Sequence, residues 1–282
     1  MYKLSNWSLA LLAGVTILAS TGCDKLRARD HMNQGVASFR NAKYNDAVEH
    51  FKQASALEPD NPNGTLYLAT AYMVQWIPGA ESPENVEFSN KAKEGFMKVL
   101  EKDPNNTTAL ASLASLAYNA AQSLPLDKKL EKYDEAAGWN KKRIAADDKD
   151  KEAYYMLGVI SWAKWYPALN LAKVNLHMKP EDPGPLKDKK VREELRSQYL
   201  AIVDDGIANL HKAIDIDKEY DDAMAYLNLL VREKADLADN PEDYKKGIDE
   251  ADGWVQKALD TKKIKAARQP TTGGIVQDAP KN

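Results

Sequence analysis

The side chains best suited to binding a metal or acting as general bases are the four histidines, His31, His50, His177 and His211. A helix brings residues three or four apart onto one face, so metal-binding histidine pairs commonly have that spacing. No two of these histidines have it, and none lies in an HExxH or cysteine–histidine pattern. We therefore expect surface or structural roles for the histidines, and we predict no metal site.

Two acidic clusters, at 147–150 and 215–222, are the other candidate metal ligands. They lack the central glycine and the distal glutamate of a calcium-binding loop. Both fall between stretches of helical periodicity, where aspartate side chains cap helix ends, and we expect that role for them. The chain also has no GxSxG, Walker or GxGxxG signature. The sequence therefore predicts no catalytic residues and no cofactor, and a protein that is not an enzyme.

The single cysteine, Cys23, stands where a different chemistry, lipid attachment, is expected. Lys3 precedes a mainly apolar run from Trp7 to Ala19, and the small residues Ser20, Thr21 and Gly22 lead to the cysteine. The run is shorter than the roughly 20 residues of a membrane span. The arrangement resembles the bacterial lipoprotein signal, in which cleavage precedes the cysteine and the cysteine is acylated, although Ser20 replaces the usual leucine. The alternative is an ordinary signal peptide with an incidental cysteine.

The resemblance implies a signal peptide over residues 1–22 and a lipidated linker over 23–27. It places the folded part in the bacterial cell envelope, facing the periplasm or the outside of the cell, and held on a membrane by several acyl chains. Asp24 resembles an inner-membrane retention signal of enteric bacteria. That rule does not hold reliably elsewhere, so the leaflet stays open.

Composition limits the class of the remaining chain. Of 282 residues, 44% are hydrophobic and 29% charged, which is typical of a globular protein that is not disordered. The formal net charge of -3 does not suggest a nucleic-acid partner, which would require a basic face, so none is expected. One cysteine cannot form an internal disulfide bond.

The stretch from Tyr44 to Pro59 shows how the chain is organised. Its apolar positions form one stripe of a helix: Ala47, Val48, Phe51, Ala54 and Leu57. Pro59 ends that helix, and Gly35 lies in a second helical pattern just upstream. This pairing resembles the tetratricopeptide repeat, a helix–turn–helix unit of about 34 residues.

The pattern recurs along the chain, so we expect an all-α solenoid of about five stacked helix–turn–helix repeats over residues 28–262. Ala92 and Gly158 take packing positions between paired helices, and the phrase EAAGW at 135–139 returns as EADGW at 250–254. Inserted loops are expected after the first helix of three repeats, the longest from Trp165 to Lys190, where prolines are frequent. Residues 263–282 lack periodicity and are predicted to be a disordered tail.

The resemblance implies a scaffold that binds another protein or peptide in the groove lined by the first helix of each repeat. Few of the expected lining residues are charged, so the carboxylate clamp known in this family is not expected. Methionine and aromatic side chains suit an apolar segment. The expected lining residues are Met32, Val36, Phe39, Leu66, Thr70, Met73, Ala111, Ser115, Tyr118, Tyr155, Val159 and Trp162.

Four alternatives remain open from the sequence. The insert from Trp165 to Lys190 could cover the groove, or the lining residues could belong to the core. The chain could instead be an envelope enzyme or glycan-processing factor on a repeat frame, which a clustered acid pair in a cleft would favour. It could also be a structural oligomer that stacks end to end.

Overall fold

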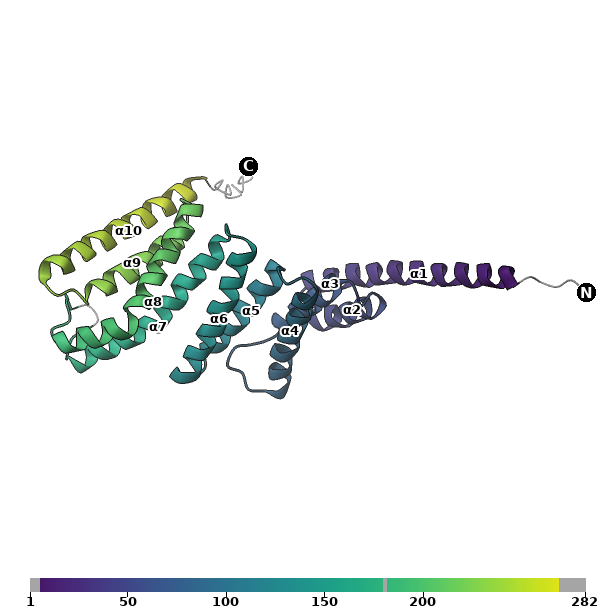
Figure 1. Ribbon diagram of the computed structural model, residues 1–282, viewed down its shortest axis with the longest axis horizontal. Helices are drawn as coiled ribbons and strands as arrows, with labels where there is room; N and C mark the ends of the chain where they lie inside the picture. The colour runs from purple at the N-terminus through teal and green to yellow at the C-terminus, as the bar shows by residue number, and fades with distance from the viewer. Residues whose placement is uncertain (1–5, 180–181, 269–282) are drawn as a thin grey trace, which may run out of the picture. The chain divides into compact units, whose positions relative to one another are not determined.

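The computed structural model describes residues 6–179 and 182–268, and every regular element in that part of the chain is an α-helix. The described helices are shown in Figure 1 and are, in order, α1 (Asn6–Arg40), α2 (Tyr44–Leu57), α3 (Pro62–Met73), α4 (Pro83–Lys102), α5 (Thr107–Ala121), α6 (Leu126–Ala146), α7 (Lys151–Asn175), α8 (Lys189–Ile216), α9 (Asp221–Ala235) and α10 (Pro241–Arg268).

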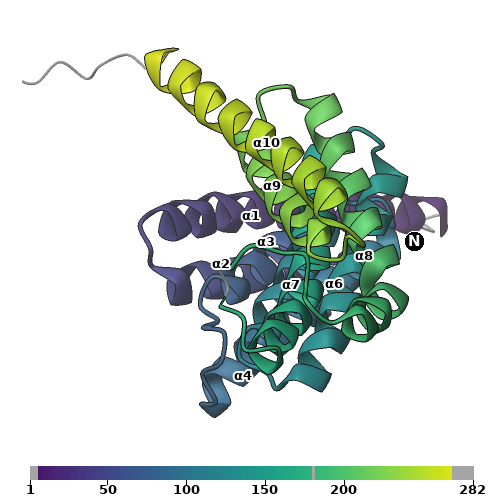
Figure 2. The same cartoon turned by 90° about the vertical axis from the view of Figure 1, so that its left-hand side faces the viewer.

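The helices form two compact units, residues 1–148 and 149–282. Unit 1 contains the helical hairpins α1–α2, α3–α4 and α5–α6, and unit 2 contains α7–α8 and α9–α10. Within each unit, the second helix of one hairpin packs on the first helix of the next. The close pairing of α9 with α10 is visible in both Figure 1 and Figure 2. The predicted all-α solenoid of paired helices is therefore confirmed.

Polar side chains fix where several helices begin. The Ser82 side chain accepts a hydrogen bond of 3.2 Å from the backbone N–H of Asn85, and Pro83 occupies the first turn. Asn106 and Asp150 cap α5 and α7 in the same way, with bonds of 3.0 Å. Each cap satisfies a backbone donor that the first helical turn leaves open. The capping role predicted for the cluster at 147–150 is confirmed at Asp150, whereas α9, which begins within the cluster at 215–222, has no side-chain cap.

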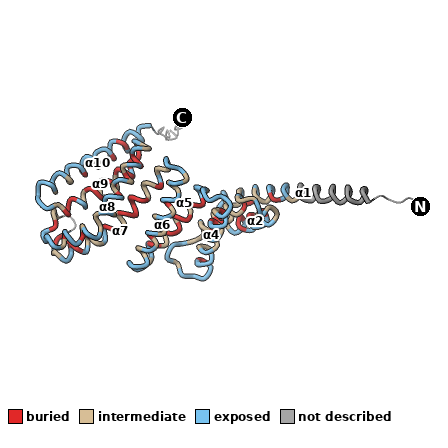
Figure 3. Tube along the Cα trace, in the orientation of Figure 1, coloured by how far each residue is buried: buried red, intermediate tan, exposed pale blue. Residues whose placement is uncertain are grey.

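The first helices of the later hairpins are the most deeply buried elements. Figure 3 shows buried positions recurring along α5, α7 and α9, which carry more of them than their partners α6, α8 and α10. Small residues allow the close approach: Ala47 and Ala92 are fully buried beside Phe51 and Phe96. This agrees with the packing role predicted for Ala92.

Gly158 brings α7 close to α8. A Cβ atom added at Gly158 would lie 2.4–2.9 Å from three side-chain carbons of Leu210, closer than any ordinary contact.

We expect Gly158→Val to cost about 1–3 kcal/mol of unfolding free energy, because Leu210 must move within a packed core. Gly253→Ala is the control, since nothing lies within 4 Å of a Cβ there. Helix propensity predicts a gain of up to about 1 kcal/mol for that control. Equal urea midpoints for both variants would contradict this packing.

The expected insert from Trp165 to Lys190 is wrong in its first half. Helix α7 continues through Pro167 to Asn175, and the connection to α8 is correspondingly short. Proline in a helix costs about 3 kcal/mol through a lost hydrogen bond and a clash. Burial of the apolar side chains on either side offsets that cost, since Trp165 and Leu169 are 0% and 2% exposed.

Two predicted chain segments also differ from the structure at the ends of the repeat region. Residues 23–27, expected as a linker, lie inside α1, where the run from Asp24 to Asp30 contains no helix breaker. The expected tail begins too early, because α10 runs to Arg268, whose guanidinium lies 2.6 Å from the Glu219 carboxylate. Residues 269–282 of that tail lie outside the described residues, as do residues 1–5 of the expected signal peptide.

Over the described residues, no helix combines the length and the mean hydropathy that a membrane crossing requires.

Candidate protein-binding surface

Five aromatic rings form a continuous run along α7 and α9, the first helices of the two hairpins of unit 2. In order, the run is Tyr220, Tyr155, Tyr226, Trp162 and Tyr166, and successive ring centroids lie 5.2, 5.6, 5.7 and 5.0 Å apart. We call this set the aromatic ladder. Its spacings are those of stabilising ring pairs, so each ring helps to hold its neighbours in place.

The aromatic ladder is only partly covered by the rest of the chain. Tyr220, which precedes the first turn of α9, is buried, whereas Tyr155, Trp162 and Tyr226 are half-buried and Tyr166 is 37% exposed. Half-exposed aromatic side chains held in place by neighbours can bury large apolar areas against a partner at little cost in side-chain entropy.

Acidic groups lie at the Tyr220 end of the ladder. The Tyr220 hydroxyl donates a 2.7 Å hydrogen bond to the exposed carboxylate of Glu152. Burial, that hydrogen bond and the nearby charges of Glu152 and Asp222 raise the pKa of Tyr220 well above its usual range. Lys151 lies 5.2 Å from the Tyr220 ring centroid, but its ammonium is 2.6 Å from the Asp217 carboxylate.

A buried carboxylate lies at the other end of the ladder. The indole N–H of Trp162 donates a 3.0 Å hydrogen bond to Oε1 of Glu233, while Oε2 is buried and has no hydrogen-bond partner among the described residues. Burial raises the pKa of Glu233 to about 7, and the charge of Asp236 adds to the effect; the Trp162 hydrogen bond and the charge of Lys173 oppose it. Lys173 and Asp236 form a buried ion pair of 2.8 Å.

The two neighbouring acids, Glu233 and Asp236, do not have the geometry of a solvent-accessible general acid and base. Glu233 and Asp236 are engaged by an indole and an ammonium group away from solvent, and burial also raises the pKa of Asp236, against the influence of Lys173. Over the described residues, no group of three histidine, cysteine, aspartate or glutamate side chains is placed to hold a metal ion.

The expected groove residues are divided between the two units. In unit 1 they lie half-buried on α1, α3 and α5, and these residues are Met32, Val36, Phe39, Leu66, Thr70, Met73, Ala111, Ser115 and Tyr118. In unit 2, Tyr155 and Trp162 lie in the aromatic ladder. Val159 is the exception, because it is 3% exposed and belongs to the core rather than to a lining surface. That these residues bind a peptide stays a prediction.

Sequence reasoning missed Tyr166, Tyr220, Tyr226 and Glu233. Aligning residues 152–160 with 222–230 would have placed Tyr226 on the first helix of the last repeat, beside the position of Tyr155. No spacing rule would have found Glu233, because its partner Trp162 lies 71 residues away in sequence.

The structure also brings together two histidines that their spacing did not connect. Nδ1 of His31 on α1 lies 3.4 Å from Nδ1 of His50 on α2, and both rings are half-buried. A ring N–H facing a ring nitrogen makes a hydrogen bond between the two helices. This agrees with the structural role expected for them.

The stacked hairpins, with small residues where paired helices meet, define the class: the chain has the fold of a tetratricopeptide-type helical-repeat protein. Among solved structures it is similar to a double mutant of MamA from RS-1, with a TM-score of 0.54, 17% identity, and coverage of 86% of this chain and 97% of that one. It is also similar to MamA, residue 41 to the end, from Desulfovibrio magneticus RS-1, with a TM-score of 0.51, 16% identity, and coverage of 86% and 98%.

A third similar structure is TTC0263, described as a thermophilic TPR protein of Thermus thermophilus, with a TM-score of 0.40, 17% identity, and coverage of 74% of this chain and 98% of that one. No protein-family model matches the sequence, and no curated protein sequence matches it. At these identities the likeness to the two MamA structures establishes the fold alone.

Proposed function

We propose that the protein is a scaffold that binds another protein through the first helices of its repeats, with the aromatic ladder as the main contact. The observation that carries this proposal is the partial exposure of Tyr155, Trp162, Tyr166 and Tyr226 on neighbouring helices. Rings that only stabilised the fold would be expected in the core, as Trp165 is. Helical-repeat surfaces of this kind commonly bind peptides and proteins.

Site-specific photo-cross-linking tests the scaffold proposal. With Tyr166 replaced by p-benzoylphenylalanine, we expect a cross-linked partner in cells of the source organism. The matched control carries p-benzoylphenylalanine in place of Glu194, which is exposed on α8. Adding Tyr155→Ala and Trp162→Ala should abolish the Tyr166 product while circular dichroism stays unchanged. The same products from both positions, or no product from Tyr166, would argue against this surface.

We also propose that Cys23 anchors the scaffold to a membrane of the cell envelope through acyl chains. The proposal is supported by the apolar run before the cysteine and by the exposure of Cys23, the one free cysteine of the chain. A thiol outside the core is available for modification without disturbing the fold.

Replacing the cysteine tests the anchor. We expect Cys23→Ser to move the protein from the membrane fraction to the soluble fraction, or to leave it as an uncleaved precursor, because no acyl chain can be attached. Intact-mass analysis of the mature wild-type protein should show the added acyl mass. Ser20→Leu, which restores the usual residue, should keep the protein on membranes. A mature protein without acyl mass would rule out the anchor.

A further inference from the structure

We infer that the partner segment bound by the aromatic ladder is a basic, amphipathic peptide that presents lysine or arginine beside leucine-like side chains. The inference rests on the proposed scaffold function and adds the chemical class of the partner. It is carried by the charges around the ladder together with the exposure of the rings.

Two exposed carboxylates near the Tyr220 end of the ladder, Glu152 and Asp222, have no cationic partner within the described residues. No lysine, arginine or histidine nitrogen in that part of the chain lies within 4.0 Å of either carboxylate. Lysines close to the ladder are already paired with other carboxylates: Lys151 with Asp217, Lys173 with Asp236 and Lys265 with Asp221. The surface therefore offers negative charge that a basic partner would complement.

The rings themselves favour the same partner. Tyr155 and Trp162 meet Tyr226 at steep interplanar angles, 79° and 81°, and Tyr166 stacks on Trp162 at 19°. Aromatic faces attract ammonium and guanidinium groups through the ring quadrupole, and their apolar area buries aliphatic side chains. A lysine or arginine side chain offers both an aliphatic stem and a cationic end.

Because of Glu233, the affinity for a basic peptide is expected to depend on pH. The carboxyl is hydrogen-bonded to Trp162 and faces Lys173 and Asp236, so a cation bound over the ladder would favour its ionised form. We therefore expect a basic peptide to bind more tightly as pH rises through 7.

Two designed peptides test the inference with the full-length protein. Both are labelled helices of about 15 residues with leucine on one face, and the other face carries lysine in one and glutamate in the other. By fluorescence anisotropy we expect the lysine peptide to bind at least about tenfold more tightly than the glutamate peptide, and less tightly in high salt.

Paired variants locate the binding site. Glu152→Gln with Asp222→Asn should raise the Kd of the lysine peptide about tenfold, and glutamine can still accept the Tyr220 hydrogen bond. The matched control, Glu194→Gln with Asp205→Asn, removes the same charge from exposed positions on α8 and should change the Kd less than about twofold.

Two outcomes would overturn the inference. If the two peptides bind equally and Trp162→Ala weakens both, the proposed scaffold function is retained, but the preference for a basic partner is contradicted. An equal effect of the two charge pairs would show that the lysine peptide binds through net charge and not at the ladder. Failure of the scaffold itself would appear separately, as the absence of a cross-linked partner at Tyr166.

Discussion

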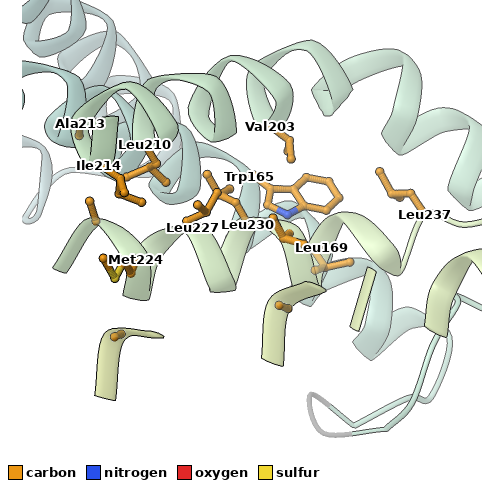
Figure 4. Close-up of a cluster of buried hydrophobic side chains, with 14 of the residues drawn as sticks. Trp165, Leu169, Val203, Leu210, Ala213, Ile214, Met224, Leu227, Leu230 and Leu237 are labelled. Atoms are coloured by element: carbon orange, nitrogen blue, oxygen red, sulfur yellow. The ribbon is translucent and has the colours of Figure 1, made fainter. Parts of the chain in front are cut away.

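Replacing Trp165 by alanine is expected to lower the free energy of unfolding of unit 2 by about 3–5 kcal/mol. Trp165 is 0% exposed and lies in the core that α7, α8 and α9 share. Figure 4 shows the indole among Leu169, Val203 and Leu230. Alanine would remove most of these contacts and leave a large cavity, because helices fixed by their other contacts relax only in part.

Urea unfolding of the full chain, followed by circular dichroism, measures the effect. Trp165→Phe is the matched control, since phenylalanine keeps an aromatic ring where the indole lies 5.6 Å from the ring of Tyr199, and leaves a smaller cavity. We expect its loss of stability to be clearly below that of Trp165→Ala. An alanine variant as stable as the wild type would mean that α7 does not continue as a packed helix past this residue.

Replacing Glu233 by glutamine is expected to stabilise the protein above neutral pH. In the folded protein the pKa of Glu233 is about 7, against 4.5 for an ordinary glutamate, so the folded state binds its proton more tightly. As pH rises from 4.5 to 7 the unfolded state loses this proton first, and stability falls by roughly 3 kcal/mol in total. Glutamine has no proton to lose, so its advantage is absent below pH 4.5 and complete above pH 7.

The measurement compares the two proteins at several pH values. The difference in unfolding free energy between Glu233→Gln and wild type should grow between about pH 5 and pH 7.5 and then level off. Glu194→Gln, at an exposed position, should show no such slope. A difference that is constant with pH would mean that Glu233 is ionised throughout this range.

The fold was largely predictable because small and capping residues act locally. Ser82 caps its helix through the backbone N–H of a residue three positions later. Gly158 has no side chain at the packing position of its repeat, which indicates that the partner helix comes close there. Such signals depend on a few residues of one helix and its partner, so periodicity and residue type suffice to find them.

The helix ends were predicted less well because packing from distant residues decides them. Pro167 predicts a break, yet Trp165 and Leu169 bury enough apolar surface to keep the helix intact. Beyond Lys262, the contacts of Lys265 with Asp221 and of Arg268 with Glu219 stabilise the last turns of α10. These partners lie more than 40 residues away in sequence.

The candidate site was predicted only in part for the same reason. Tyr155 and Trp162 follow from their place on the first helix of a repeat. Tyr220 and Tyr226 join them only because α9 packs beside α7, and Val159 turns into the core. The charge character of the surface depends on which lysines are neutralised, as Lys151 is by Asp217, and no single repeat contains that information.

The continuity of helix α1 through residues 23–27 has a mechanical consequence. A flexible linker of five residues would let the scaffold swivel freely, with a reach of up to about 17 Å. Those residues are helical instead, rise by only about 8 Å, and lead directly to Ala28, which is 1% exposed. A lipid attached at Cys23 would therefore be joined to the first repeat by a rigid helix rather than by a flexible linker. It would limit the angles at which the first repeat meets the membrane plane, and with them the directions from which a partner approaches.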